Sequence, residues 1–393
     1  MKKIYLDHIA ATPLLPEARE AMLPYFGELF GNPQSRHGFG AEPRKAIEAA
    51  RREVADLIGA EPREMIFTAS GTEANNLAIK GVLGAGQKKG KHIIASVIEH
   101  FSVAHPLKRL EQEGYAVTWL PVDEKGLIRP EQVAAAIRPD TVLVSTLSAN
   151  NEIGVIQPIE EIGAIAQEAG AIFHTDAVAA VGIIPFRVDS LGIDLAGFSA
   201  QQFYGPKGVG ALYARRGIRL RPLIEGGIQE EGRRGGTENV AGIIGMGAAA
   251  ACAKGRLSTE VPRLTALRDR LIDGLLQRVP LLHLTGDRSR RLPHIASFAV
   301  EFVDGEALIR LLEKRGIIAA SGSSCSADAL KISPVLTAIG LHPTVAQGGV
   351  VFSLGLQTTK EEIDIVLSVF PECVEEIRRV SPLYHAAIAG IKR

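Results

Sequence analysis

The stretch DLAGFSAQQFYGPKGVGALYA, residues 194–214, holds two short apolar runs, DLAGFSA and GVGALYA, on either side of a polar, glycine-containing turn. Short apolar runs bounded by turn residues are typical of buried β-strands. The side chains of Ser199, Gln201 and Gln202 come at the end of the first run or directly after it. The stretch therefore predicts two strands, with polar groups placed where the first strand ends.

Five similar runs precede this stretch, beginning near residue 64. They read EMIFTAS, HIIASVIE, YAVTWLPV, TVLVSTLSA and AIFHTDA, and amphipathic segments such as GTEANNLAIKGVLGA and PIEEIGAIAQEAG separate several of them. Strands that alternate with helices predict a mostly parallel sheet covered on both faces. We therefore expect an α/β fold built on a mostly parallel, seven-stranded sheet between helices.

The pattern changes after the charged helical segment AKGRLSTEVPRLTALRDRLIDGLLQRV. Strand-like HIASFAVEF and GGVVFSLGL then alternate with helix-like GEALIRLLEKRG and KEEIDIVLSVF, which predicts a smaller α+β domain. We place the boundary at about residue 258. The expected division is a large domain over residues 15–258 and a small domain formed by residues 1–14 and 259–393.

Composition argues against several classes of partner. Lys plus Arg and Asp plus Glu both number 44, so no basic stripe for nucleic acid is evident. No apolar run reaches the roughly 18 residues that a membrane span needs, and the N-terminus turns polar too soon for a signal peptide. We expect a cytoplasmic protein that binds a small molecule or another protein, and neither nucleic acid nor a membrane.

The three cysteines, Cys252, Cys325 and Cys373, show neither a CxxC pair nor metal-ligand spacing, so a disulfide framework or metal site is not expected. Cys252 and Cys373 lie among apolar neighbours in helical patterns, which is typical of buried thiols. Cys325 lies in SGSSCSADAL. Small, polar and glycine-containing surroundings predict that this thiol lies on an exposed, mobile loop.

Polar residues follow several predicted strands, where sites on parallel sheets form. Gly71 and Thr72 offer amides and a hydroxyl for an anion at a strand-to-helix turn, and Asp176 offers a carboxylate. A phosphate site, a carboxylate, a flat group over the ring and a lysine together meet the needs of pyridoxal phosphate, PLP. Each residue alone is equally typical of an ordinary cap, turn or strand end.

As an ordered set, the motifs resemble those of the cysteine desulfurases of the NifS/IscS group, within the class V aminotransferase family. The similarity covers essentially the whole chain through YLDHIAATP, FGNPQSRHGFG, FTASGTEANNLAIKG, VIEH, NNEIGVIQPI, HTDA, YGPKGVGALY, GGTENVAG, SGSSCSADAL and FSLG. The resemblance implies an aspartate aminotransferase-like PLP fold. It also implies a role in sulfur transfer or iron–sulfur assembly, with a sulfur acceptor or iron–sulfur scaffold protein as partner.

The resemblance also implies roles for single residues. Thr72 and Ser199 would contact the cofactor phosphate and His100 would stack on the ring. Asn151 would lie near the phenolic oxygen and the substrate, and Asp176 would pair with the pyridine nitrogen. Thr237, which is also a plausible plain helix cap, would reach the phosphate of the neighbouring subunit, so a homodimer is expected.

The chain departs from the family where the cofactor would be attached. The family has a His-Lys pair in the opening stretch, and this chain has Gln201 and Gln202. A glutamine amide is neither basic nor nucleophilic at neutral pH and cannot form the covalent bond. Lys207 lies five residues further on, in the GPKG turn that the family carries in addition to its anchoring lysine.

Four further positions differ, and one of them is Ile9, where the family has an asparagine. The family glutamine that donates to the phenolic oxygen is Ala179 here. The arginine that would clamp the substrate carboxylate is Val351, and a second arginine just after it is Leu356. These changes predict that standard desulfuration of free cysteine is very slow or absent.

The surviving Cys325 corresponds to the family cysteine that becomes a persulfide. An exposed thiolate can also receive sulfur by exchange, without PLP in the same chain. An inherited bystander thiol is an equally good interpretation.

Three hypotheses follow for the whole chain. It is a degenerate homologue acting through an acceptor, a scaffold or a catalytic paralogue, with PLP absent. In the second hypothesis the chain is an enzyme that holds PLP without a covalent bond, with Gln201 donating a hydrogen bond to the phosphate. In the third, its pocket has been repurposed for another, less polar ligand.

Overall fold

The computed structural model describes residues 3–321, 332–382 and 384–386. Cys325, the thiol singled out above, therefore lies outside the described residues. All seven strand-like runs before residue 215 form strands of one sheet. In spatial order they are β2 (Met65–Thr68), β8 (Gly210–Ala214), β7 (Leu195–Ser199), β6 (Ile172–Asp176), β5 (Thr141–Ser145), β3 (His92–Ser96) and β4 (Ala116–Leu120).

Within this sheet β8 runs antiparallel to both of its neighbours, and the other strands run parallel to one another. Successive residues of a strand point to opposite faces. Ile93 faces a core formed with helices α3 (Gly71–Ala85) and α4 (Phe101–Gln112), whereas Ile94 belongs to the core on the other face. The expected helix-covered, mostly parallel sheet is confirmed.

The second core is covered by α2 (Gly38–Ile58), α6 (Ile159–Glu168) and the first half of α7 (Val240–Arg278). The shorter elements around the sheet are α1 (Pro16–Met22), η1 (Leu23–Phe26), η2 (Pro62–Glu64), α5 (Pro130–Ala136), η3 (Ala200–Phe203) and η4 (Gln229–Gly232). All strands of this sheet except the edge strand β4 are buried on both faces, which explains why their sequences read as continuous apolar runs.

A second, smaller part has its own core. Its three-stranded antiparallel sheet has the order β12 (Gly349–Ser353), β10 (Ile295–Val300) and β9 (Leu282–Leu284), covered by α8 (Gly305–Lys314) and α11 (Lys360–Arg379). Two short helices, α9 (Pro334–Ala338) and α10 (Pro343–Ala346), complete it. The N-terminal strand β1 (Ile4–Tyr5) pairs with β11 (Ile317–Ile318), so both ends of the chain contribute to this part.

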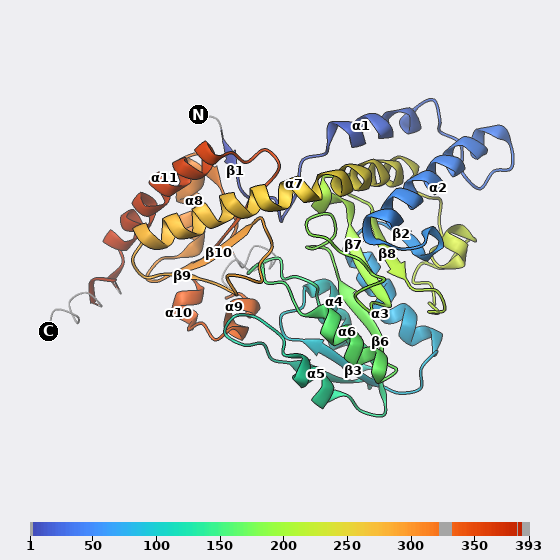
Figure 1. The fold of residues 1–393 in the computed structure, drawn as a ribbon, viewed down its shortest axis with the longest axis horizontal. Coiled ribbons are helices and arrows are strands. Elements are labelled where there is room, and N and C mark those ends of the chain that lie inside the picture. Colours follow the sequence, from blue (N-terminus) through green and yellow to red (C-terminus); the bar gives the residue numbers. More distant parts are fainter. Residues whose placement is uncertain (1–2, 322–331, 383, 387–393) are drawn as a thin grey trace.

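Helix α7 runs through both parts (Figure 1). Its first half packs on α1 and α2, and its second half packs on α11 and the small sheet. Among the described residues it is the one helix long and apolar enough to cross a membrane, but half of its most apolar window is buried, as in the core helix of a soluble protein. The boundary placed at residue 258 falls inside α7, and the division into two domains stays a prediction.

Candidate active site

Asp176 is the last residue of β6 and is only 5% exposed. Its Oδ2 accepts a hydrogen bond from Asn75 Nδ2 at 2.8 Å, and its Oδ1 accepts one from the backbone N–H of Val178 at 3.0 Å. Burial raises the pKa of Asp176, while nearby His100 and the donors to the carboxylate act in the opposite direction. The carboxylate is therefore held in one orientation at the carboxyl end of the sheet.

Asn75, from the buried face of α3, connects this carboxylate to two other polar groups. Its amide nitrogen also donates to Ser102 Oγ at 2.9 Å, and its amide oxygen lies 3.3 Å from His174 Nε2. The amide approaches the sheet closely, because a Cβ at Gly197 would lie 2.1 Å from Asn75 Oδ1. Position 197 therefore requires glycine.

His174 lies two residues before Asp176 on β6 and is fully buried. Its Nδ1 lies 2.8 Å from Ser145 Oγ. Burial lowers the pKa of His174 to about 3, so the ring is neutral. Sequence reasoning missed His174 and Asn75, although their spacing from Asp176 and Gly71 places each pair on one face of its strand or helix.

His100 caps the N-terminus of α4 and is half-buried. The backbone N–H of Ser102 donates to His100 Nδ1 at 3.1 Å, and Ser102 Oγ lies 2.8 Å from the same nitrogen. Because Ser102 also bonds Asn75, the predicted ring residue and Asp176 belong to one hydrogen-bonded network. The structure thus brings these two predicted site residues together.

Gly71, Thr72 and Ser199 are the residues predicted to bind an anion, and they define what we call the anion-binding corner, whose function stays a prediction. Gly71 opens α3, and a Cβ at that position would lie 2.6 Å from Val178 Cγ2 and 3.6 Å from Ser199 Cβ. Thr72 is exposed in the first turn of α3. N–H groups in a first helical turn have no intrahelical partner, and they attract anions.

The two glutamines lie in η3, directly after β7. Gln202 is 6% exposed, and its Nε2 donates to the backbone carbonyl of Ile9 at 2.8 Å. Gln201 is half-buried, and its backbone carbonyl accepts a hydrogen bond from Thr12 Oγ1. The side chain at the family's lysine position is therefore engaged in holding the N-terminal segment.

The other departures lie in apolar surroundings. Val351 lies in β12 opposite Ser297 and is 3% exposed, within the core on the α2 face of the large sheet. Ala179 belongs to the same core. Leu356 is half-buried, and its backbone N–H donates to Tyr204 Oη at 2.7 Å. These three side chains offer no hydrogen-bonding group to a substrate.

The remaining predicted residues lie at the margins of this arrangement. Asn151 is half-buried in the turn after β5, Thr237 is exposed in the loop before α7, and Lys207 is exposed in the turn before β8. Next to Asn151, Glu152 Oε2 accepts a hydrogen bond from Ser333 Oγ at 2.8 Å. Burial raises the pKa of Glu152 to about 8.

The sequence predicts that Cys252 and Cys373 are buried. Cys373 is buried as expected, whereas Cys252 is only half-buried.

Sequence reasoning also missed Glu99, the residue before His100. It is buried, and its Oε1 accepts hydrogen bonds from the backbone N–H of Leu147 at 3.0 Å and from Ser96 Oγ. Burial raises the pKa of Glu99 to about 8, and the charge of Asp176 acts in the same direction. Its buried surroundings therefore favour the protonated form of Glu99.

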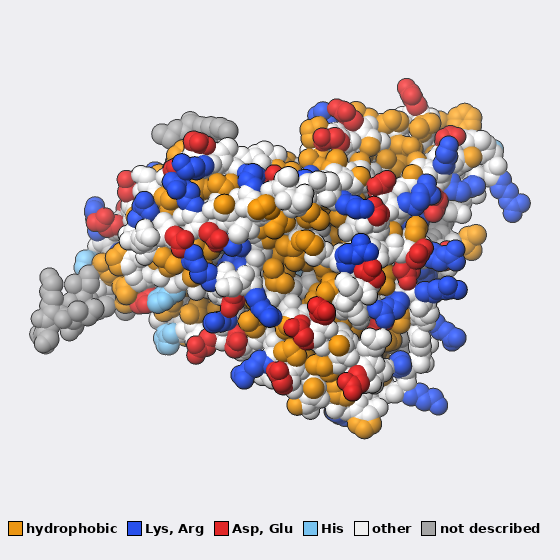
Figure 2. All heavy atoms as spheres, viewed as in Figure 1, with side chains coloured by type: hydrophobic (Ala, Val, Ile, Leu, Met, Phe, Trp, Pro, Cys, Tyr) orange, Lys and Arg blue, Asp and Glu red, His pale blue; other side chains and the backbone are white. Residues whose placement is uncertain are grey.

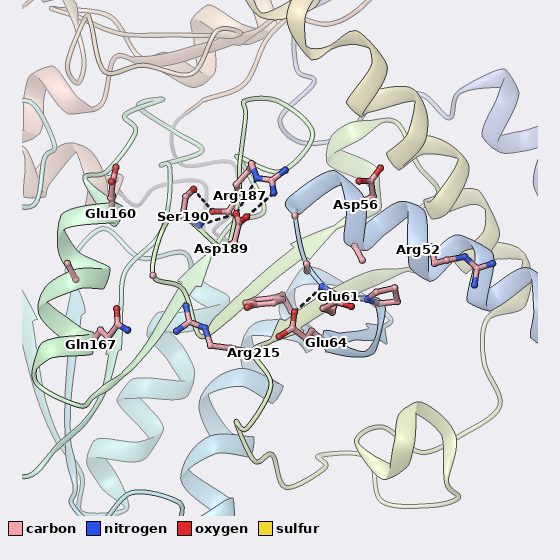
Figure 3. Close-up of a pocket in the computed structure, with 17 residues that line it drawn as sticks. Arg52, Asp56, Glu61, Glu64, Glu160, Gln167, Arg187, Asp189, Ser190 and Arg215 are labelled. Carbon is pink, nitrogen blue, oxygen red and sulfur yellow. Dashed lines mark hydrogen bonds and ion pairs between the residues drawn. The ribbon is translucent and has the colours of Figure 1, made fainter.

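A wide groove of about 950 Å³ lies between the end of α2, η2 and residues 187–192 (Figure 3). Arg187 and Asp189 pair there at 2.8 Å, and Asp56 pairs with Lys254. None of the predicted site residues within the described ranges lines this groove. Because much of its charge is already paired, the groove offers no set of groups comparable to that around Asp176.

The family model for aminotransferase class V matches residues 4–366, and the chain belongs to this family. Cysteine desulfurase IscS of Dictyoglomus turgidum is 49% identical over 381 residues, which cover 97% of each chain. Cysteine desulfurase IscS of Methanosarcina thermophila is 48% identical over 382 residues, covering 97% of this chain and 94% of the relative. Within the family the chain is a homologue of the NifS/IscS cysteine desulfurases.

Solved structures support the same relationship. A NifS-like protein superimposes with a TM-score of 0.89 at 36% identity, covering 95% of this chain and 99% of that one. The apo structure of a cysteine desulfurase from Thermococcus onnurineus gives a TM-score of 0.85 at 28% identity, covering 95% of each chain. The fold class and family expected from the motifs are confirmed.

The family is PLP-dependent, and the residues of this chain fit that cofactor in part. The oriented carboxylate of Asp176 suits a ring nitrogen, and the open turn at Gly71 and Thr72 suits a phosphate. At the position where the resemblance places the anchoring lysine, however, Gln202 carries an amide, and that amide donates a hydrogen bond to the backbone carbonyl of Ile9. The cofactor would supply electron withdrawal from a bound amino acid.

Proposed function

We propose that this protein is a cysteine desulfurase homologue that acts in sulfur transfer without running the standard PLP-dependent reaction. The observation that carries the proposal is Gln202, whose buried amide stands at the lysine position and donates to Ile9 O at 2.8 Å. An amide nitrogen has no basic lone pair, so it neither attaches an aldehyde nor carries protons during turnover.

The substrate side supports the same proposal. A bidentate arginine bond to a substrate carboxylate contributes about 1.5–3 kcal/mol, or roughly ten- to a hundred-fold in affinity. Val351 and Leu356 have no donor in their side chains, so this contribution is lost. Weak substrate binding would therefore persist even if a lysine were restored at position 202.

Cys325 is the residue we assign to sulfur transfer. Its thiolate would attack the terminal sulfur of a persulfide on a donor protein, and the donor cysteine would leave as a thiolate. The new persulfide would then pass its sulfur to an acceptor or an iron–sulfur scaffold by the same exchange. This role requires a catalytic paralogue or another persulfide donor, and we place it in the cytoplasm.

We further propose a homodimer. Exposed apolar side chains gather over the end of the molecule formed by α1, η1 and the start of α2 (Figure 2). Phe26, Phe30 and Phe39 are 69%, 71% and 65% exposed, and the last two rings lie 5.8 Å apart. Apolar patches of this kind mark interfaces, and a second copy of the chain is the simplest occupant. Thr237 would contact the partner's phosphate site in such a dimer.

A second candidate function is an enzyme that holds PLP without a covalent bond. The observation that favours it is the intact hydrogen-bonded network from Asp176 through Asn75 and Ser102 to His100. In this case Gln201 would replace the family histidine as a phosphate donor. Slow or altered chemistry would then depend on this network.

Two measurements separate the candidates. The purified chain is titrated with PLP and its absorbance followed, and sulfide release from cysteine is compared between the parent and Cys325→Ala. We expect no sulfide above background in either protein. Sulfide release by the parent that is lost in Cys325→Ala, or borohydride fixation of a phosphopyridoxyl group on any lysine, contradicts the proposal.

A third measurement tests the sulfur-transfer role itself. The parent is incubated with a persulfidated donor protein, and persulfide on Cys325 is measured by mass spectrometry, with Cys252 as the internal control. We expect sulfur on Cys325 and little on Cys252. Equal labelling of the two thiols would show that Cys325 is a bystander.

A further inference from the structure

A small crevice of about 30 Å³ lies where the N-terminal segment, the η3 turn and the small sheet meet. Its lining includes His8, Gln202, Tyr204, His294 and Leu356. Two positions that depart from the family pattern, Gln202 and Leu356, therefore line the same small space. The crevice belongs to neither the Asp176 network nor the anion-binding corner.

His294 places a buried ring nitrogen without a hydrogen-bond partner at this crevice. The residue precedes β10, is 3% exposed, and its Nδ1 is buried without a hydrogen-bond partner among the described residues. Burial lowers the pKa of His294 to about 3, so its ring is neutral and has one bare nitrogen and one N–H. Buried polar atoms in native proteins nearly always have a protein or water partner.

His8 lines the same crevice and supplies a second acceptor. Its Nδ1 lies 3.0 Å from the carbonyl oxygen of Ser353. A carbonyl only accepts, so Nδ1 carries the hydrogen and Nε2 is bare in the neutral ring. Burial also lowers the pKa of His8, and the nearness of His8 contributes to the lowered pKa of His294. Two neutral imidazoles therefore lie close together.

Tyr204 adds a hydroxyl donor to these two rings. Its Oη accepts from the N–H of Leu356 at 2.7 Å, which leaves the hydroxyl hydrogen available for another partner. The lining thus combines the acceptor Nε2 of His8, the unpartnered Nδ1 of His294 and a donor on the tyrosine. A ligand that both donates and accepts would satisfy all three groups.

The charged groups at the crevice are already engaged. The guanidinium of Arg256 lies 5.1 Å from the centre of the Tyr204 ring and donates to the carbonyl of Phe203 at 3.1 Å. Glu260 pairs with Arg263 at 2.7 Å. No group of three metal-ligating side chains is found within the described ranges. A neutral ligand suits this site better than an ion.

We propose that the crevice is a binding site for one water molecule, which hydrogen-bonds to His294 Nδ1, His8 Nε2 and the Tyr204 hydroxyl. A water needs about 10–15 Å³ of such space and two to four polar partners. The crevice meets both conditions. The water would join three segments that are distant in sequence: the N-terminal segment, the η3 turn and the start of β10.

The test is a high-resolution crystal structure of the full chain, with and without xenon under pressure. We expect one water peak within hydrogen-bonding distance of His294 Nδ1, and no xenon, which binds in dry apolar cavities. A dry crevice, a xenon peak or an anomalous metal peak there would overturn the proposal. A His294 ring turned onto a protein partner would overturn it too.

A matched pair of variants sharpens the result. His294→Leu removes the acceptor and is expected to lose the water peak, while the control His283→Leu, on neighbouring β9, keeps it. If His294→Leu does not fold, His8→Leu removes another of the three partners and is expected to lower the occupancy of the water. An unchanged peak in either test variant contradicts the assignment.

Discussion

Around Asp176 the polar side chains bond to one another, whereas around Gln202 they bond to the backbone or give way to apolar residues. Asn75 connects Asp176, Ser102 and His174. By contrast, the Gln202 side chain donates a hydrogen bond to the backbone carbonyl of Ile9, and Val351 is part of an apolar core. Residues of the first kind stabilise the fold whether or not the protein catalyses anything. Their retention is therefore weaker evidence for activity than the family pattern suggests.

The largest loss of stability is expected for a variant of Asn75, and its absence would contradict the contrast between the Asp176 network and Gln202. Asn75→Leu leaves Asp176, Ser102 and His174 without their shared partner, so the free energy of unfolding should fall by about 3 kcal/mol. Urea denaturation measures the change. The control is Asn76→Ala, which removes bonds to two backbone carbonyls and should cost about 1 kcal/mol. Equal losses of unfolding free energy in Asn75→Leu and Asn76→Ala would show that the Asp176 network adds no special stability.

The second prediction concerns Glu99, whose folded pKa of about 8 lies above its ordinary value. The unfolded chain therefore loses this proton first as pH rises, and the stabilising contribution present below about pH 4.5 is lost by about pH 8. Glu99→Gln should remove that loss, so that the variant gains roughly 3 kcal/mol relative to the parent between pH 5 and pH 8. Denaturation at both pH values tests this, with exposed Glu17→Gln as control. Parallel pH profiles would show that Glu99 is ionised in the fold.

A smaller loss of unfolding free energy is expected for a variant of Gln202. Gln202→Leu removes one hydrogen bond to Ile9 and should reduce the free energy of unfolding by about 1 kcal/mol. Gln202→Lys should release no sulfide from cysteine, because the carboxylate clamp is also missing. Full desulfurase activity in that single variant would show that Val351 matters less than proposed.

The smallest effect on stability is expected for Thr72→Ala, a variant that tests PLP binding without a large change in the free energy of unfolding. Thr72 is exposed, so Thr72→Ala should change the free energy of unfolding by less than about 0.5 kcal/mol. If the first turn of α3 binds phosphate, the same variant should weaken PLP binding several-fold in an absorbance titration. The exposed Thr259→Ala on α7 is the control. Unchanged binding in Thr72→Ala would remove this residue from the anion site.

The fold could be predicted from the sequence because most strands of the large sheet are buried on both faces and read as apolar runs. The positions of Asp176, Gly71 and Ser199 followed from the rule that parallel strands bring their carboxyl ends to one edge. The partners of these residues could not be found this way. Asn75 and Glu99 look like ordinary polar residues in the sequence, and only the fold shows that they are buried beside Asp176.

The interpretation of Gln202 illustrates a second limit. The sequence shows that a lysine is replaced, but not what the new side chain does. Its bond to Ile9 joins segments 193 residues apart, and no local pattern carries that information. The crevice shared by Gln202, His8 and His294 has the same origin, because it depends on three segments that meet only in the folded chain.

Helix α7 is a single continuous element of 39 residues that packs on both parts of the protein. Each residue of an α-helix advances the axis by 1.5 Å and turns it by about 100°. Inserting or deleting one residue near its middle would therefore rotate the small sheet relative to the large one by more than a quarter turn. Length changes in this helix should be tolerated only in steps that restore the angular phase, whereas surface loops have no such constraint.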